Sequence, residues 1–305
     1  MALPESNGPV VKSFLRNLRG LLVFAGIAIN TLFWAAPLLL LALVKLLPIA
    51  PLRRALTRWL MWIGESWIAV NSWLLTHAAS IDWQASGLDG LSTSGWYLVI
   101  SNHQSWVDIL VLQKVFNRRI PFLKFFIKRQ LIWFPILGLA WWALDMPFMK
   151  RYSPSYLAKH PDKKGRDLET TRKACERFRE SPTSVINFIE GTRFSEQKRN
   201  ARNSPYRHLL APRAGGFAVA MASMGSLFDA IVDVTLVYPD GPAKFWDLCC
   251  GKHVPVIIDT RQRAVDEKLV NGDYQEDREF RRHVHTWLND TWAVKDALIA
   301  KHLES

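Results

Sequence analysis

Two residues in the segment SNHQSWVD, Ser101–Asp108, are of a type and spacing suited to proton transfer. His103 and Asp108 are separated by four residues, so an aspartate on a helix that begins just after the histidine can reach one imidazole nitrogen. That hydrogen bond would fix the tautomer and leave the other nitrogen free to accept a proton. The pair is the orienting half of a Ser-His-Asp triad in which a substrate hydroxyl replaces the serine. A histidine with a purely structural role is the competing interpretation.

A second polar group follows the β-rich run SVINFI at Ser184–Ile189. It consists of Glu190, Gly191, Thr192 and Arg193, a combination that suits a phosphate. The glycine would let the backbone approach the anion, the threonine would donate a hydrogen bond, and the arginine would grip two oxygens at once. The glutamate is expected to hold the arginine in place. A turn with a surface salt bridge is the competing interpretation.

Both motifs stand where a predicted strand ends. Beyond residue 80, short β-rich runs predict strands at Tyr97–Ser101, Ser184–Ile189, Ile231–Tyr238 and Val254–Asp259. Helical patterns lie at Asp167–Glu180 and Glu276–His302. The alternation predicts an α/β fold with a mostly parallel central sheet covered by helices. Ligands of such sheets bind at the carboxyl ends of the strands, which is where both motifs lie.

The first eighty residues have the composition of a membrane attachment. The apolar run Leu21–Leu47 is long enough to cross a hydrocarbon core about 30 Å thick, although Pro37 is expected to kink it. The next run, Trp59–Leu75, carries four tryptophans, which favour the headgroup layer. Basic residues flank the first run on both sides, so charge does not choose between one crossing and a re-entrant hairpin. We expect membrane-anchoring helices over 1–80 and a catalytic domain over 81–305.

The composition narrows the classes of function. Lys and Arg outnumber Asp and Glu by 39 to 27, a formal net charge of +12, which favours anionic partners. Three cysteines exclude a disulfide framework, and no Cys/His spacing indicates a metal site. No G-x-S-x-G motif supports a serine hydrolase, and no nucleic-acid-binding motif is present. A non-catalytic, membrane-tethered lipid- or nucleic-acid-binding protein is the alternative from a different class.

Two further segments allow more than one interpretation. The apolar run Ile132–Leu144 has the length of a buried core element, but it follows a basic cluster and could instead dock on lipid or line an acyl channel. The basic segment Gln197–Arg207 is either a solvated loop or a contact for lipid headgroups or an acidic carrier.

The motifs together resemble the glycerophospholipid acyltransferase family, of the 1-acyl-sn-glycerol-3-phosphate acyltransferase type. Asn102–Asp108 matches its first block, N-H-x-x-x-x-D (the HX4D motif), and Phe188–Arg193 matches its third, F-x-E-G-T-R. Asp145–Arg151 stands where the second block ends in an aromatic residue and an arginine, and Pro239 stands where the fourth block has its proline. Bacterial members also begin with a two-helix membrane motif.

The resemblance implies a reaction. His103, oriented by Asp108, would deprotonate the sn-2 hydroxyl of 1-acylglycerol-3-phosphate, which attacks the thioester of acyl-CoA or acyl-carrier protein to give phosphatidic acid. No cofactor, metal or covalent acyl-enzyme is implied. The enzyme would lie in a bacterial inner membrane among anionic lipids, with its catalytic domain facing the cytoplasm.

The resemblance also implies roles for the remaining motif residues. The acceptor's phosphate would be bound by Glu190, Gly191, Thr192, Arg193 and Arg151, with Asn102 and Pro239 in supporting roles. The second block lacks its usual glycine near Phe148, and the aromatic run Trp133–Trp142 is closer to the branch that includes lysocardiolipin acyltransferases. Lysocardiolipin and lysophosphatidylglycerol are therefore alternative acceptors.

Overall fold

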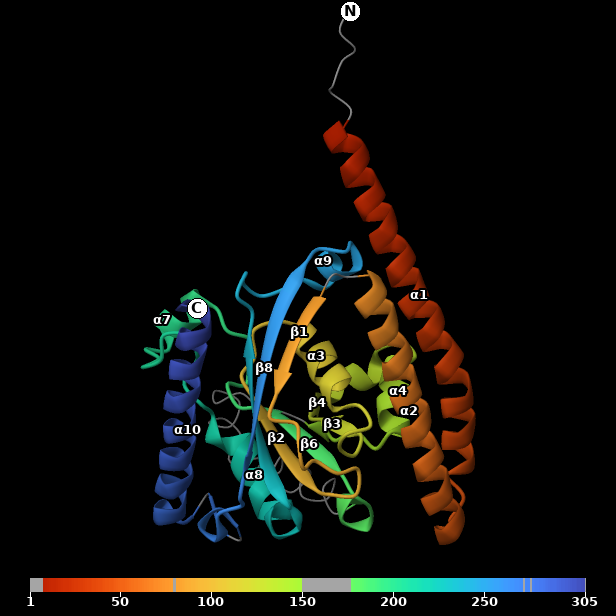
Figure 1. Ribbon diagram of the computed structural model, residues 1–305. Helices are drawn as coiled ribbons and strands as arrows, with labels where there is room; N and C mark the ends of the chain where they lie inside the picture. Colours follow the sequence, from red (N-terminus) through yellow and green to blue (C-terminus); the bar gives the residue numbers. More distant parts are fainter. Residues whose placement is uncertain (1–7, 79–80, 150–176, 271, 275, 305) are drawn as a thin grey trace, which may run out of the picture.

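A computed structural model describes residues 8–78, 81–149, 177–270, 272–274 and 276–304 (Figure 1). Two long antiparallel helices run along one flank of an α/β domain, and the N-terminal part of the first projects beyond it.

The two-helix motif consists of α1 (Gly8–Val44) and α2 (Ala50–Ala78). Within the described residues only Val11–Val44 is long and apolar enough to cross a membrane. Pro37 lies inside α1 without ending it. The polar residues that interrupt the apolar run are used between the helices, because the Asn30 side-chain amide donates to the Asn71 side chain at 2.9 Å.

The hairpin shares a hydrophobic core with the rest of the protein. Leu38 of α1 and Leu60 of α2 are buried in one cluster with Phe122 and Leu144. Along their length the two helices also contact α3 (Val107–Phe116), α4 (Leu137–Ala143) and α9 (Phe245–Cys249). The membrane motif therefore packs lengthwise against the domain instead of standing apart from it (Figure 1).

The central sheet has six strands in the order β1-β8-β7-β2-β6-β3. All neighbours are parallel except β7 and β8, which confirms the predicted fold class. The strands are β1 (Ile81–Ser86), β2 (Tyr97–Ser101), β3 (Leu123–Phe125), β6 (Ser184–Phe188), β7 (Ala230–Val237) and β8 (Val254–Arg263). All four predicted strands are present, whereas β1 and the three-residue β3 were not predicted.

Both faces of the sheet are covered, so its strands are apolar on both sides. Leu98 and Ile100 of β2 face the core formed with α8 (Ala214–Met224) and α10 (Arg278–Glu304). Val99 faces the opposite core, which includes α3. The predicted C-terminal helix is α10. The predicted helix Asp167–Glu180 lies mostly outside the described residues, and its end forms the short helix η4 (Arg177–Glu180).

Of the two interpretations of Ile132–Leu144, the structure does not favour a wholly buried core element. This run forms the end of η2 (Arg129–Trp133) and α4, and five of its large apolar side chains are exposed: Trp133 (86%), Phe134 (52%), Ile136 (36%), Leu139 (52%) and Trp142 (40%). Gly138, Ala143 and Leu144 are buried, and the last two pack against the hairpin. These side chains add to the exposed apolar surface of the helices.

The remaining elements are short: β4 (Ile127–Lys128), β5 (Phe148–Met149), α7 (Glu196–Ala201), η5 (Gly225–Leu227) and η6 (Glu267–Leu269). Strands β4 and β5 form a separate two-stranded sheet.

Candidate active site

The two motifs meet at one edge of the sheet. Strands β2 and β6 are parallel neighbours, and Ser101 is paired with Phe188 at their last residues. The loops that follow are joined through the backbone, because the Phe194 N–H donates to the His103 carbonyl at 2.7 Å. Sequence segments about 85 residues apart therefore form one site at the carboxyl ends of the strands, as such sheets favour.

His103 and Asp108 form the predicted hydrogen bond. Helix α3 begins at Val107, which places Asp108 in its first turn, and Asp108 Oδ2 lies 2.7 Å from His103 Nδ1. The imidazole also stacks on Phe188, with ring centroids 4.0 Å apart. The aspartate is fully buried, whereas the histidine side chain is 14% exposed. The ring is fixed through Nδ1, so Nε2 is the nitrogen available to a substrate proton.

The carboxylate of Asp108 accepts several hydrogen bonds besides the one to His103. The backbone N–H groups of Gln104 and Ser105 donate to Oδ2 at 2.6 and 2.9 Å. The Tyr238 hydroxyl donates to Oδ1 at 2.7 Å. Because the aspartate is surrounded by donors, Nδ1 of the histidine is the fourth donor and carries a proton. This arrangement sets the tautomer that a general base at Nε2 needs.

Tyr238 is a site residue that sequence reasoning missed. It follows β7 directly and is 3% exposed. Burial, and then the negative charge and hydrogen bond of Asp108, raise the pKa of its hydroxyl well above the usual value, so it stays a donor. Its neighbour Pro239, predicted to support the site, is exposed. The sequence does show a tyrosine at the end of a predicted strand. Its contact with Asp108 can be predicted only when β7 is known to be the neighbour of β2.

Asn102 connects the loop after β2 to β7. Its side-chain amide donates to the Leu236 carbonyl, and its side-chain oxygen accepts from the Leu236 N–H, both at 2.9 Å. The asparagine is fully buried and continues the pairing of the two strands by one residue. This position is consistent with a supporting role, since it holds the backbone immediately before His103.

Glu190 departs from its predicted role. Its side chain is fully buried, and within the described residues it makes no hydrogen bond or ion pair with Arg193. Burial raises the pKa of this carboxyl to about 8, against the lowering effects of the Leu210 and His103 backbone groups and of Lys295. Neither oxygen has a partner in good hydrogen-bonding geometry, so the backbone effects are weak. The carboxyl is mostly protonated near neutral pH and is buried, unlike the exposed Arg193.

The other residues of the third block lie at the surface of the site. Gly191 has a φ of +68°, a left-handed conformation that favours glycine, in the turn that leaves β6. The Thr192 hydroxyl accepts from Lys198 Nζ at 3.2 Å. The exposed Arg193 guanidinium stacks over Trp106, 4.9 Å from the ring centre, and so lies beside the first motif.

Two cations, Arg193 and Lys198, therefore lie near the loop where a phosphate is expected. Lys198 belongs to the basic segment Gln197–Arg207, which the sequence left open as a possible contact for lipid headgroups. Arg151, predicted to assist them, lies outside the described residues. Within the described parts of the chain, no group of three or more His, Cys, Asp or Glu residues could hold a metal ion.

A buried ion pair stabilises β7 beneath the site. Lys295 of α10 reaches Asp233 Oδ1 at 2.7 Å and donates to the Val234 carbonyl. Arg263 of β8 contacts the same aspartate at 2.9 Å. Burial lowers the pKa of Lys295, and Asp233 opposes this effect. Because β7 carries the partners of both Asn102 and Asp108, this cluster supports the dyad indirectly.

Comparisons with known proteins agree with this geometry. Residues 82–239 match the family model described as "Acyltransferase". A 258-residue region is 25% identical to 1-acyl-sn-glycerol-3-phosphate acyltransferase 3 of Arabidopsis thaliana, covering 80% of this chain and 61% of that protein. A 152-residue region is 29% identical to the human delta form of the same enzyme, covering 46% of this chain and 37% of that protein. The chain thus spans less than two thirds of the length of both relatives.

A solved structure shows the same fold. The crystal structure of PlsC, the 1-acyl-sn-glycerophosphate acyltransferase from Thermotoga maritima, superposes with a TM-score of 0.57 and covers 93% of this chain and 98% of its own. At 16% identity this likeness concerns the fold alone. The family model, however, covers more than half of the chain, including both motifs. The chain therefore belongs to the acyltransferase family, as its motifs indicated.

Proposed function

We propose that this enzyme moves a fatty acyl group from an acyl thioester to the sn-2 hydroxyl of 1-acylglycerol-3-phosphate, giving phosphatidic acid. The observation that carries the proposal is the dyad, in which Nδ1 of His103 is bonded to the buried Asp108 at 2.7 Å and Nε2 is left for the substrate. The names of the relatives support the choice of acceptor.

The reaction follows from the position of the imidazole. Nε2 of His103 takes the proton of the acceptor hydroxyl, whose oxygen attacks the thioester carbonyl carbon. The carbon–sulfur bond then breaks, and the departing thiolate recovers the proton from the imidazolium. Asp108 stabilises the transient positive charge. General base catalysis of this kind contributes about 10²–10⁴-fold, and the positioning of both substrates supplies further acceleration.

The acceptor phosphate is assigned to Arg193, Lys198 and Thr192. Thr192 and Arg193 lie on the loop that meets His103, and Lys198 of the following helix α7 donates to Thr192 and to the Arg193 carbonyl. The two cations can form charge-assisted bonds with phosphate oxygens. Glu190 is left out of this group because its buried carboxyl cannot reach the ligand. The acyl donor is acyl-CoA or acyl-carrier protein, used as a substrate, and the proposal includes no cofactor.

Membrane attachment is proposed through one broad apolar surface. Helix α1 exposes large apolar side chains along its length, among them Leu22, Phe33 and Leu40. Exposed tryptophans are added by α2 (Trp59 and Trp62) and by the η2–α4 segment (Trp133). Because the hairpin packs along the flank of the domain, we infer that it lies within one leaflet. The face in question is the cytoplasmic side of a bacterial inner membrane with anionic lipids, where the thioester donors occur.

The test is an acyl-transfer assay on the full chain in detergent, with lysophosphatidate and long-chain acyl-CoA. His103→Ala is expected to remove product formation, whereas His253→Ala, at an exposed histidine, keeps it. Lysophosphatidylglycerol and lysocardiolipin serve as competing acceptors. If either of them is acylated faster than lysophosphatidate, that lipid becomes the proposed acceptor. Equal product from wild type and His103→Ala would overturn the assignment of the base.

A further inference from the structure

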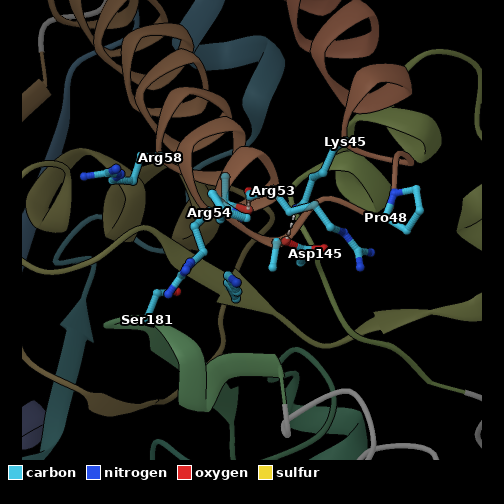
Figure 2. Close-up of a pocket in the computed structure, with 11 residues that line it drawn as sticks. Lys45, Pro48, Arg53, Arg54, Arg58, Asp145 and Ser181 are labelled. Atoms are coloured by element: carbon cyan, nitrogen blue, oxygen red, sulfur yellow. Dashed lines mark hydrogen bonds and ion pairs between the residues drawn. The ribbon is translucent and has the colours of Figure 1, made fainter.

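A large cavity lies at the turn of the helical hairpin, away from the dyad (Figure 2). Its volume is about 1070 Å³. The end of α1, the start of α2, β3 and the segment before β6 form its walls, with the lining residues Lys45, Pro48, Ala50, Pro51, Arg53, Arg54, Thr57, Arg58, Lys124, Asp145 and Ser181.

The cavity lies at the amino-terminal ends of the strands, whereas the active site lies at their carboxyl ends. Ser181 precedes the first residue of β6, whereas the dyad lies beyond the last residue of its neighbour β2. Strand β6 is five residues long, so the two edges are roughly 16 Å apart. The cavity is therefore too far from His103 to hold the phosphate of a reacting acceptor.

The walls are strongly cationic. Five lining residues are Lys or Arg, and the single carboxylate, Asp145, is already paired with Lys45 at 2.5 Å. Arg53, Arg54 and Arg58 have no side-chain hydrogen bond or ion pair with any described residue. Figure 2 shows Arg54 extending from α2 toward Ser181, across the space between the hairpin and the domain.

The position of these arginines is unfavourable without an anion. Arg53 and Arg54 lie at the start of α2, where the helix dipole is positive, and no acidic residue occupies the first turn. Cations at that end of a helix repel the dipole and each other. A bound phosphate would relieve both repulsions.

The surroundings identify the source of the phosphate. The turn between the helices exposes Leu46, Leu47 and Ile49, and α2 exposes Trp59 and Trp62 directly after Arg58. Apolar residues flanked by tryptophan and arginine are typical of the boundary between hydrocarbon and headgroups. The cavity thus lies at the level of lipid phosphates if the apolar surface rests in the membrane.

We propose that this cavity binds the phosphate-bearing headgroup of an anionic membrane phospholipid that is not a substrate. The bound headgroup joins the hairpin turn to the amino-terminal edge of the sheet. The inference rests on the membrane attachment of the proposed function and is independent of acyl transfer.

The test measures lipid binding to the full chain in a non-ionic detergent. The probes are short-chain phosphatidylglycerol and phosphatidylcholine, titrated while the thermal unfolding midpoint and the heat of binding are recorded. Arg53→Gln/Arg54→Gln is compared with Lys12→Gln/Arg16→Gln, which removes the same charge from exposed residues at the other end of the hairpin. Arg58→Gln provides a second, milder cavity variant. All are made in both the wild-type and the His103→Ala background.

Phosphatidylglycerol is expected to bind wild type, the His103→Ala protein and the Lys12/Arg16 variant alike, and to bind the Arg53/Arg54 variant on the order of tenfold more weakly. Phosphatidylcholine is expected to bind none of them at this site. Equally weakened phosphatidylglycerol binding in the two double variants would mean that the lipid binds through diffuse surface charge, and it would overturn the proposed site. Inorganic phosphate binding as tightly as the lipid, or cavity-dependent binding of an acidic carrier protein without lipid binding, would overturn the lipid as the occupant.

Discussion

Two buried carboxyls at the same edge of the sheet have opposite surroundings. Asp108 and Glu190 follow the neighbouring strands β2 and β6, and both are fully buried. Asp108 accepts hydrogen bonds from four donors. Neither oxygen of Glu190 has a partner in good hydrogen-bonding geometry, and burial raises its pKa to about 8.

The difference shows that burial alone does not decide what a carboxyl does in a site. Four donors compensate Asp108 for the loss of water, so it can accept from His103 Nδ1 and orient the ring. Glu190 lacks that compensation and is better accommodated as a neutral acid that packs beneath the loop. We infer that the first carboxyl orients the histidine that transfers the proton, and that the second is structural.

The largest effect is expected from Asp108→Asn. An amide cannot accept from all four donors, and its own NH₂ group would point at some of them. The proton of the histidine is then no longer fixed on Nδ1, and the imidazolium has no neighbouring negative charge. We expect kcat to fall about 10³–10⁴-fold with little change in KM. Steady-state kinetics measures both, and circular dichroism checks the fold. A loss of less than tenfold would mean that Asp108 does not orient the base.

Arg193→Gln tests which residues of the third block contact the acceptor. Losing one charge-assisted contact with phosphate should raise the KM for lysophosphatidate about 10–100-fold. Glu190→Gln is the matched variant and should leave that KM within about twofold, since the carboxyl is buried and already neutral. A comparable rise in KM for both variants would restore the original assignment of Glu190 to the phosphate site.

A smaller effect is expected from Tyr238→Phe, which removes one donor from Asp108. The carboxylate is then held by three donors in place of four, so the imidazole is oriented less firmly. We expect kcat to fall about three- to tenfold. Tyr97→Phe is the control, because this buried tyrosine accepts from the Ser92 backbone instead. An unchanged kcat in Tyr238→Phe would mean that Tyr238 is a packing residue.

Substituting Glu190 is expected to have the smallest effect on catalysis. Its protonation is expected to affect the pH dependence of the free energy of unfolding instead. Its folded-state pKa is raised from the usual 4.5 to about 8, so the folded protein holds a proton that the unfolded chain releases. The contribution of this proton to the free energy of unfolding is complete below about pH 4.5 and is lost as pH rises through about 8. The free energy of unfolding then falls by up to about 1.4 kcal/mol per pH unit.

Glu190→Gln should remove this dependence. Thermal unfolding between about pH 5 and 9 should show the wild-type midpoint falling relative to the variant. Parallel curves for the two proteins would mean that Glu190 is ionised in the folded state and has donors after all.

The local sequence was sufficient for the elements and for the dyad. Continuous β-branched runs such as Tyr97–Ser101 and Ser184–Phe188 read as buried strands because both of their faces are covered. His103 and Asp108 lie on one loop and the first turn of α3, so their contact depends only on where that helix begins. The apolar character of α1 likewise needs no tertiary information.

The tertiary structure decided what lies between distant segments. Tyr238 meets Asp108 across 130 residues, and Asn102 meets Leu236 across 134, because β7 happens to be the neighbour of β2. Strand order depends on how the whole sheet is covered, and no local pattern encodes it. The same holds for the short β3 and for the antiparallel β8, whose pairing partners are remote in sequence.

Burial was the other property that residue types could not reveal. Glu190 and Arg193 are three residues apart in one motif, yet one faces inward and the other lies exposed beside Trp106. The apolar run around Trp133 exposes its large side chains, although its end packs against the hairpin. Sequence thus determined which groups are available for chemistry, while desolvation and donor placement, which arise only on folding, determined which of them carry charge and reach a ligand.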